Sequence, residues 1–264
     1  MKRPRPEATT GGPGTPPGAP RASLLTRVVP VPGGVRLMQG RVVLSELRLQ
    51  PGPTHSVFDV LASLLARLAA PGNVGVLGFG AGGVMAPLRA LGFDRLIHAV
   101  DTDPIGHDVF RHGCPEWSRR VEWSRADAVE WLRGSRGRFA ALLDDLSEPR
   151  DGDVHKPAVC WRALPRLMRS RLTPGGVAVF NLVPDADGSW PGIDEVRRLF
   201  PLVMEVRYRD YLNRTVVATR MPADGPPRSP WGLGRGVQAD LRRMGSRLAG
   251  RTSCHRWMGG IHGS

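Results

Sequence analysis

The sequence is poor in cysteine, in lysine and in long apolar runs. Its 264 residues include three cysteines and only two lysines, Lys2 and Lys156. The cysteines are scattered and odd in number, without a disulfide framework or a Cys-x-x-Cys pair, which suits a reducing compartment. No apolar run reaches the roughly 18 residues that cross a bilayer, and no secretory segment opens the chain. We therefore expect a cytoplasmic protein that does not insert into a membrane.

Positive charge is carried almost wholly by arginine, and it gathers toward the two ends of the chain. The formal net charge is +13. Residues 1–33 contain five basic side chains and one acidic side chain, whereas residues 221–264 contain seven arginines and two acidic side chains. Residues 34–220 therefore hold only +4. Because most of the excess lies outside this middle segment, we do not expect the folded core to bind nucleic acid.

The two ends are predicted to differ from the middle in order as well as in charge. Residues 1–33 are rich in proline and glycine and are predicted to form a disordered tail, with order beginning near residues 28–35. Residues 221–264 are predicted to form a basic tail, solvated or loosely docked, in which VQADLRRMGSRLAG has the pattern of a short amphipathic helix. Within this tail Cys254, His255 and His262 lack the spacing of a structural metal site, so no metal is expected.

Residues 34–72 are predicted to form a β-hairpin followed by a helix. The stretch VRLMQGRVVLSELRL alternates apolar and polar residues around a Gln-Gly pair, which is typical of a hairpin. The spacing Ser56-x-x-Asp59 resembles a capping box, and apolar residues then recur at helical spacing. A Pro-Gly pair at residues 71–72 ends this helix.

Residues 73–220 alternate between predicted strands and predicted helices. The strand runs VGVL, FAALL and VAVF are apolar throughout, as expected when helices cover both faces of a parallel sheet. We therefore predict an α/β fold, a Rossmann-like and mostly parallel sheet closed by an antiparallel hairpin at residues 202–220. The expected strands are 74–78, 96–101, 120–124, 139–144 and 176–182, and the expected helices are 82–91, 104–113, 127–133, 156–171 and 192–199.

A glycine-rich turn, VGVLGFGAGG, follows the first of these strands. It fits the G-x-G-x-x-G spacing of a dinucleotide site at Gly78, Gly80 and Gly83, and equally fits G-x-G-x-G at Gly78, Gly80 and Gly82. In both cases the glycines allow a tight strand-to-helix turn, and the ligand can lie on exposed backbone N–H groups. The turn alone leaves open whether the ligand is a pyrophosphate or a nucleoside without phosphate.

Acidic residues follow three later strands, at the edge of the sheet where open parallel sheets bind ligands. Asp101 ends the second strand, where a carboxylate can accept hydrogen bonds from ribose hydroxyls, and Asp127 stands at the start of a helix. The fourth strand ends in LLDDLSEP, which brings Asp144, Asp145 and Glu148 close together. This anionic group suits a cationic sulfonium and an amine better than a pyrophosphate.

Taken in order, these motifs resemble the spermidine synthase-like branch of the class I S-adenosylmethionine-dependent transferase fold. The resemblance covers about residues 34–220 and rests on the order of VLGFGAGG, AVDTDP, ADAVEWL and LLDDLSEP. It implies that Asp101 binds ribose, that Asp127 and Ala128 flank adenine, and that residues 78–82 face the sulfonium end. The implied cofactor is S-adenosylmethionine or its decarboxylated form, without a metal, and the N-terminal hairpin suggests a homodimer.

The sequence departs from true polyamine synthases at the positions that bind amines. Ala81 stands where that family has an acid in the glycine loop, and Glu148 replaces the aspartate expected to deprotonate the acceptor. Near the first helix only Asp59 remains of the polyamine cluster, with His55 beside it. We therefore expect methyl transfer to an amine or other small acceptor, with Glu148 or Asp145 as the base and with His55 and Asp59 as tentative substrate contacts. Aminopropyl transfer and a non-catalytic nucleoside-binding role are the alternatives.

Overall fold

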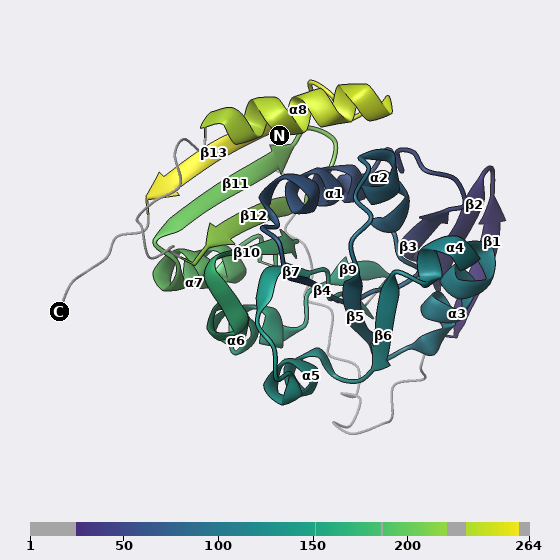
Figure 1. Ribbon diagram of the computed structural model, residues 1–264, viewed down its shortest axis with the longest axis horizontal. Coiled ribbons are helices and arrows are strands. Elements are labelled where there is room, and N and C mark those ends of the chain that lie inside the picture. The colour runs from purple at the N-terminus through teal and green to yellow at the C-terminus, as the bar shows by residue number, and fades with distance from the viewer. Residues whose placement is uncertain (1–24, 151, 186, 221–230, 259–264) are drawn as a thin grey trace, which may run out of the picture.

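The computed structural model describes residues 25–150, 152–185, 187–220 and 231–258. Within these ranges the strands form an eight-stranded main sheet, a three-stranded sheet and a two-stranded ribbon (Figure 1). From one edge to the other, the main sheet consists of β13 (Thr252–Met258), β11 (Leu202–Tyr208), β12 (Arg214–Thr219), β10 (Leu172–Leu182), β7 (Phe139–Asp144), β4 (Asn73–Leu77), β5 (Ile97–Asp101) and β6 (Val121–Arg125).

The direction of the strands confirms the predicted fold class. Strands β10, β7, β4, β5 and β6 pair in parallel, whereas β12 and β11 add to β10 as the expected antiparallel hairpin. All six residues of β7 are buried, which explains its continuous apolar sequence. Each parallel strand is followed by a helical segment that returns the chain to the other end of the sheet, as parallel pairing requires.

Alternate residues of the central strands feed two separate apolar cores. In β10, Val177 and Val179 belong to one core, and Ala178 and Phe180 belong to the other, because successive side chains of a strand point to opposite faces. The first core is covered by α1 (Val57–Leu68), α2 (Met85–Ala90), α3 (Pro104–Gly113) and α8 (Trp231–Met244), and the second by α5 (Ala128–Gly134), α6 (Leu164–Arg171) and α7 (Pro191–Leu199). Among the described residues no helix is both long and apolar enough to cross a membrane.

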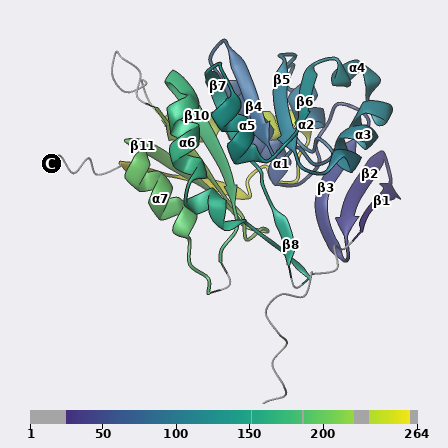
Figure 2. The ribbon, with the colours of Figure 1, turned by 90° about the horizontal axis from the view of Figure 1, so that it is seen from below.

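The small sheet has one strand more than the predicted hairpin. Its strands are β1 (Thr26–Val31), β2 (Gly34–Gln39) and β3 (Val42–Arg48), all antiparallel. The sheet lies beside α3 and α4 (Pro115–Ser118), as both ribbon views show (Figures 1 and 2). Order was predicted to begin near residues 28–35, whereas β1 already begins at Thr26, so the predicted disordered tail extends too far. Because β1 is an edge strand with exposed side chains over most of its length, it needs no apolar alternation that the sequence could reveal.

The C-terminal segment is part of the fold rather than a loosely docked tail. Helix α8 packs on α1, and β13 pairs with β11 along its whole length. Val237 and Leu241 of α8 are fully buried, and Asp240 accepts hydrogen bonds from Ser63 and Arg67 of α1. The expectation of a solvated or loosely docked segment is therefore wrong for residues 231–258. The residues on which the segment docks lie far away in sequence, in α1 and β11.

Smaller differences concern the ends of predicted elements around the site. Helix α2 begins at Met85 rather than at residue 82, because turns occupy the last part of the glycine loop. The helix predicted over residues 156–171 is divided into a 3₁₀ turn, η1 (Ala158–Trp161), and α6. Between β7 and η1 the chain forms the two-stranded ribbon β8 (Glu148–Arg150) and β9 (Asp153–His155), which was not predicted.

Candidate functional site

Two cavities adjoin at the carboxyl ends of the parallel strands. One, of about 420 Å³, is bounded by the glycine loop and by the ends of β5 and β7, and we call it the glycine-loop cavity. The other, of about 610 Å³, lies between β3, the start of α1, the end of β10 and the turn before β12, and we call it the hairpin cavity. Residues common to both walls are Leu44, Ser45, Asp145, Leu146 and Ser147.

The glycine loop forms one wall of its cavity through backbone that only glycine allows. Gly78 has φ of 82°, and its N–H donates to the carbonyl oxygen of Val100 at 3.0 Å. A Cβ atom at this position would lie 2.8 Å from the carbonyl oxygen of Asp145, so a larger residue would displace the end of β7. The N–H of Gly80 donates to Oδ2 of Asp101 at 2.8 Å, which joins the loop to the end of β5.

The second half of the glycine loop lies behind the cavity rather than on its wall. Ala81 is fully buried and belongs to the first apolar core. Gly82 faces the rings of Phe79 and Phe110, because a Cβ added to it would lie 3.0 Å and 3.1 Å from them. Among the described residues the loop lines the cavity with Gly78, Phe79 and Gly80. The structure thus separates Ala81 and Gly82 from the cofactor contacts that the sequence predicted for them.

Asp101 lies where a ligand hydroxyl could reach it. It ends β5 and lines the glycine-loop cavity. Its Oδ2 accepts the N–H of Gly80, and its Oδ1 accepts the N–H of Asp103 at 3.1 Å. Since each carboxylate oxygen has two acceptor positions, both oxygens retain capacity for a ligand.

Asp127 and Ala128 form the opposite end of the same cavity. Asp127 is the N-cap of α5, and its Oδ1 accepts the N–H groups of Val129 and Glu130 at 2.8 and 3.1 Å. Both capping bonds use one oxygen. The helix cap therefore does not compete with a hydrogen bond from a ligand to the other oxygen.

Asp144 and Asp145 follow one another at the end of β7 but face different surroundings. Asp144 is fully buried, and its Oδ1 accepts a hydrogen bond from Nζ of Lys156 at 2.9 Å. Asp145 lines both cavities. Asp144 was predicted to belong to the anionic group that contacts the sulfonium of the cofactor. The structure instead places it behind the floor of the cavities, in an ion pair.

The ion pair between Asp144 and Lys156 is almost completely enclosed, with side-chain exposures of 0% and 3%. Burial lowers the pKa of Lys156, but the neighbouring carboxylate of Asp144 and the other anionic groups around it outweigh this effect and raise the pKa overall. Lys156 therefore stays protonated and compensates the charge of Asp144. The second oxygen of Asp144, Oδ2, is buried without a hydrogen-bond partner among the described residues.

Asp145 holds its proton more strongly than an ordinary aspartate does. Burial raises the pKa of Asp145 to about 7, and the carboxylates of Asp144 and Asp101 act in the same direction. A hydrogen bond from Asn181 and the charge of Lys156 oppose this rise. Asp145 can therefore exchange a proton near neutral pH, as a general base or acid must.

Glu148 lies on the other side of the glycine-loop cavity. It begins β8, where it pairs with His155 of β9, and its side chain is exposed. Asp145 belongs to both cavities, whereas Glu148 lines only one of them among the described residues. Of the two acids predicted as the base, Asp145 has the position between the cavities.

The two tentative substrate contacts near α1 have structural partners instead. Asp59 is fully buried and accepts hydrogen bonds from the backbone N–H groups of Thr54 and His55 and from Oγ of Ser246. His55 adopts φ of 60°, and its Nδ1 accepts the N–H of Arg247 at 3.3 Å. Neither residue belongs to the described lining of the cavities. Ser56 is the N-cap of α1, as predicted. The side chain of Asp59, however, accepts the N–H groups of Thr54 and His55, the two residues before Ser56, and not that of Ser56.

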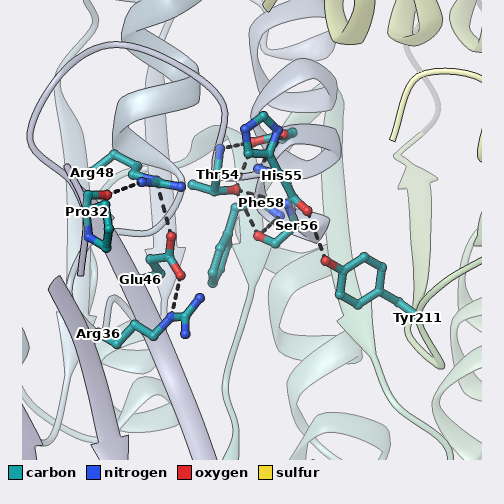
Figure 3. A network of polar contacts seen from close by, with 10 residues as sticks. Pro32, Arg36, Glu46, Arg48, Thr54, His55, Ser56, Phe58 and Tyr211 are labelled. Atoms are coloured by element: carbon teal, nitrogen blue, oxygen red, sulfur yellow. Dashed lines mark hydrogen bonds and ion pairs between the residues drawn. The ribbon is translucent and has the colours of Figure 1, made fainter. Parts of the chain in front are cut away.

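The hairpin cavity contains residues that the sequence analysis did not single out. Asn181 lies in the buried run of β10, one residue before its end, and Tyr211, Leu212 and Asn213 form the turn before β12. The hydroxyl of Tyr211 donates to the carbonyl oxygen of His55 at 3.0 Å, so this turn is attached to the start of α1 (Figure 3). A polar residue inside an otherwise apolar strand is the one local signal in the sequence that points to Asn181.

One acid of the hairpin cavity is already paired with arginines of the small sheet. Glu46 of β3 contacts Arg36 at 2.7 Å and Arg48 at 3.2 Å, and Figure 3 shows its carboxylate between the two guanidinium groups. Phe58 of α1 lies beside this group and also lines the cavity. The wall toward the small sheet is thus charge-compensated and partly aromatic, whereas Asp145 lies on the wall shared with the glycine-loop cavity.

The fold of the chain is similar to that of several solved structures. A probable spermidine synthase from Corynebacterium glutamicum shares 15% identity and a TM-score of 0.67, over 93% of this chain and 92% of that chain. Spermidine synthase from Thermotoga maritima shares 13% identity and a TM-score of 0.59, over 85% and 76% of the two chains. Human methyltransferase-like protein 13, in complex with SAH, shares 23% identity and a TM-score of 0.53, over 71% and 90%. No family model and no curated protein matches the sequence.

At these identities the likeness shows the fold and not the reaction. The chain has the class I methyltransferase fold that these methyltransferases and spermidine synthases share, together with a three-stranded N-terminal sheet. The resemblance found in the sequence is therefore confirmed at the level of the fold.

Proposed function

We propose that the protein is an S-adenosylmethionine-dependent methyltransferase that acts on a small amine acceptor. The observation that carries this proposal is the position of Asp145, which has a raised pKa and lines both adjoining cavities. A transferase needs two binding spaces that meet where a group is passed between substrates, and a base that can remove a proton there.

The glycine-loop cavity fits S-adenosylmethionine in size and in its donor and acceptor groups. Its volume, about 420 Å³, lies within the ordinary range of ligand sites. Gly78 and Gly80 would face the ligand with backbone, Asp101 would accept from the ribose hydroxyls, and Asp127 with Ala128 would flank adenine. When bound, the cofactor supplies an alkyl group on a sulfonium sulfur, which the nearby carboxylates favour by charge.

Asp145 is the proposed base. In its ionised form it accepts a proton from an amine nucleophile held in the hairpin cavity, with Asn181 and the turn at residues 211–213 beside it. Glu148, exposed on the ribbon over the glycine-loop cavity, is better suited to increase the negative potential there than to remove that proton.

One sequence feature favours intact S-adenosylmethionine over the decarboxylated form. The loop position that carries an acid in polyamine synthases is Ala81, which is fully buried in the apolar core. No carboxylate from the loop is therefore available to hold the amine of a decarboxylated cofactor or to repel the carboxylate of the intact one. The second candidate function, aminopropyl transfer, is favoured by the likeness to spermidine synthases over most of the chain.

Calorimetric titration with S-adenosylmethionine, its decarboxylated form and NAD tests the proposal first. Tighter binding of the intact sulfonium, together with release of S-adenosylhomocysteine when amines are added, would support methyl transfer. Tighter binding of the decarboxylated form, with putrescine-dependent release of methylthioadenosine, would establish the second candidate. Binding of NAD alone would reject both.

The pH profile and one variant test the role of Asp145. Because the base must be ionised, the rate should rise with pH through about 7 and fall as the carboxyl becomes protonated below it. Asp145→Asn should lower the rate about 10²- to 10⁴-fold and change cofactor affinity less than tenfold. The matched control is Asp108→Asn, an exposed residue of α3 that pairs with Arg111, and it should leave the rate unchanged.

A further inference from the structure

Two asparagine side chains connect the turn of the hairpin cavity to Asp145. Nδ2 of Asn213 donates to Oδ1 of Asn181 at 3.0 Å, and Nδ2 of Asn181 donates to Oδ1 of Asp145 at 2.7 Å. The three residues come from the turn before β12, from β10 and from the end of β7. Asn181 is buried, with 9% exposure, so its amide group has few alternatives to these two partners.

The direction of the Asn181 amide decides what Asp145 meets. An amide presents a donor on one side and an acceptor on the other. With the NH₂ group toward Asp145, the hydrogen bond favours the ionised carboxylate, whereas a flipped amide would place a carbonyl oxygen there and favour the protonated acid. The N–H donated by Asn213 requires the carbonyl oxygen of Asn181 on its own side, and therefore selects the first orientation.

We propose that Asn213 is a positioning residue that holds the Asn181 amide so that it donates to Asp145. The functional part of this inference rests on the proposed role of Asp145 as the base. Asn213 belongs to the same turn as Tyr211 and Leu212, which line the hairpin cavity. A substrate that moves this turn would therefore also change the proton affinity of Asp145, so the turn couples occupancy of the cavity to the state of the base.

Other titratable groups surround Asp145 and must stay constant in a test. They are Asp144 on the same strand, Lys156 after β9, Asp101 at the end of β5 and the phenol of Tyr208 on β11. None of them makes a hydrogen bond to Asn213 among those the structure shows for the described residues. A change at Asn213 thus acts on Asp145 through Asn181.

Nuclear magnetic resonance titration of the carboxyl carbons, with aspartate labelled at Cγ, measures the pKa of Asp145 directly. The signal is assigned as the one that Asp145→Asn removes. Asn181→Ala should raise this pKa by about one unit, and Asn213→Ala by about half a unit to one unit, because each removes the stabilisation that one hydrogen bond gives to the ionised form. Asn213→Ser, which keeps a short donor, should raise it less.

Asn73→Ala is the matched control, since Asn73 lies at the opposite end of β4 and contacts the carbonyl oxygen of Arg138. A pKa that rises in Asn181→Ala but stays constant in Asn213→Ala, or falls in it, would overturn the proposal. Circular dichroism shows whether each variant is folded, and the milder Asn213→Ser serves if Asn213→Ala is not. The titration needs neither cofactor nor acceptor, so it can succeed even where the proposed reaction is refuted.

Discussion

The glycine-loop cavity and the hairpin cavity differ in what forms their walls. The first takes about half of its wall from residues 78–128, where three strand-to-helix connections follow β4, β5 and β6. The second draws on six separate segments between residues 43 and 213. Two of these segments are further supported from outside the cavity by residues 246–251. Ser246 bonds Asp59, Arg247 bonds His55, and Arg251 bonds Asp210.

This difference affects which substitutions can alter the geometry of each cavity. The part of a wall that strand-to-helix turns form is preserved as long as these turns form, because its geometry depends on glycines and helix caps. A wall assembled from distant segments depends on how the whole fold packs. We therefore expect the cofactor side to respond to local substitutions and the acceptor side to respond to substitutions far from it.

Breaking the ion pair between Lys156 and Asp144 should have the largest effect on stability. It should affect both cavities together, because the pair lies beneath the wall that they share. Lys156→Met leaves the fully buried Asp144 carboxylate without its cation. We expect the free energy of unfolding to fall by about 3–5 kcal/mol in urea denaturation at pH 8. The uncompensated Asp144 would have a raised pKa in the folded state, so the loss should shrink as the pH is lowered.

The double variant Lys156→Met with Asp144→Asn removes both charges and serves as the control. It should recover most of the stability lost in the single variant. A single variant that loses less than about 1 kcal/mol would show that the pair contributes little and that Asp144 is compensated in another way.

Gly78→Ala should damage the glycine-loop cavity, whose wall Gly78 forms. The added Cβ would meet the carbonyl oxygen of Asp145 at 2.8 Å, in backbone with φ of 82°. We expect affinity for S-adenosylmethionine to fall more than about tenfold, with a loss of stability on the order of 1–3 kcal/mol from strain. Calorimetry and urea denaturation measure the two effects separately.

Gly92→Ala is a matched control for that substitution. Gly92 has φ of 76°, but no atom lies within 4 Å of the position of an added Cβ. It should show the strain without the loss of affinity. Equal losses of affinity in both variants would mean that the close approach of β7 to the loop does not matter for the ligand.

Ser246→Ala should have the smallest effect and should act on the hairpin cavity from a distance. Its hydroxyl donates to the buried Asp59 at 2.6 Å. We expect a loss of about 1–2 kcal/mol in stability, faster amide hydrogen exchange over residues 54–58 and 210–213, and cofactor affinity within twofold. Ser118→Ala, which loses only an exposed bond to Pro115, is the control. Faster exchange in the glycine loop instead would contradict the separation of the two cavities.

Much of the fold could be predicted because local sequence reflects local environment. The apolar runs of β4, β7 and β10 predicted strands covered on both faces, and glycines with acidic strand ends predicted the edge at which a ligand binds. Gly78, Gly80, Asp101, Asp127 and Asp145 all line the glycine-loop cavity. These positions follow from chain direction and from the turn after each strand, which neighbours in sequence determine.

Other residues could be assigned only when the tertiary structure was known. Asp144 and Asp145 are consecutive, and successive strand residues point to opposite sides, so at most one could face the cavities. The sequence does not say which, because this depends on the register of β7 against Leu77 of β4 and Phe180 of β10. Asp59 likewise looked free until Ser246, 187 positions later, was found beside it.

The sequence by itself determined the alternation of the parallel strands with helices, the glycine turn and the edge of the sheet where ligands bind. The tertiary structure decided which of the two neighbouring acids Lys156 compensates and which of them faces both cavities. It also decided that residues 231–258 join the fold. The physical reason is range: periodicity and turns arise from neighbours within a few residues, whereas the charge state of a buried group depends on whatever distant segment packs against it.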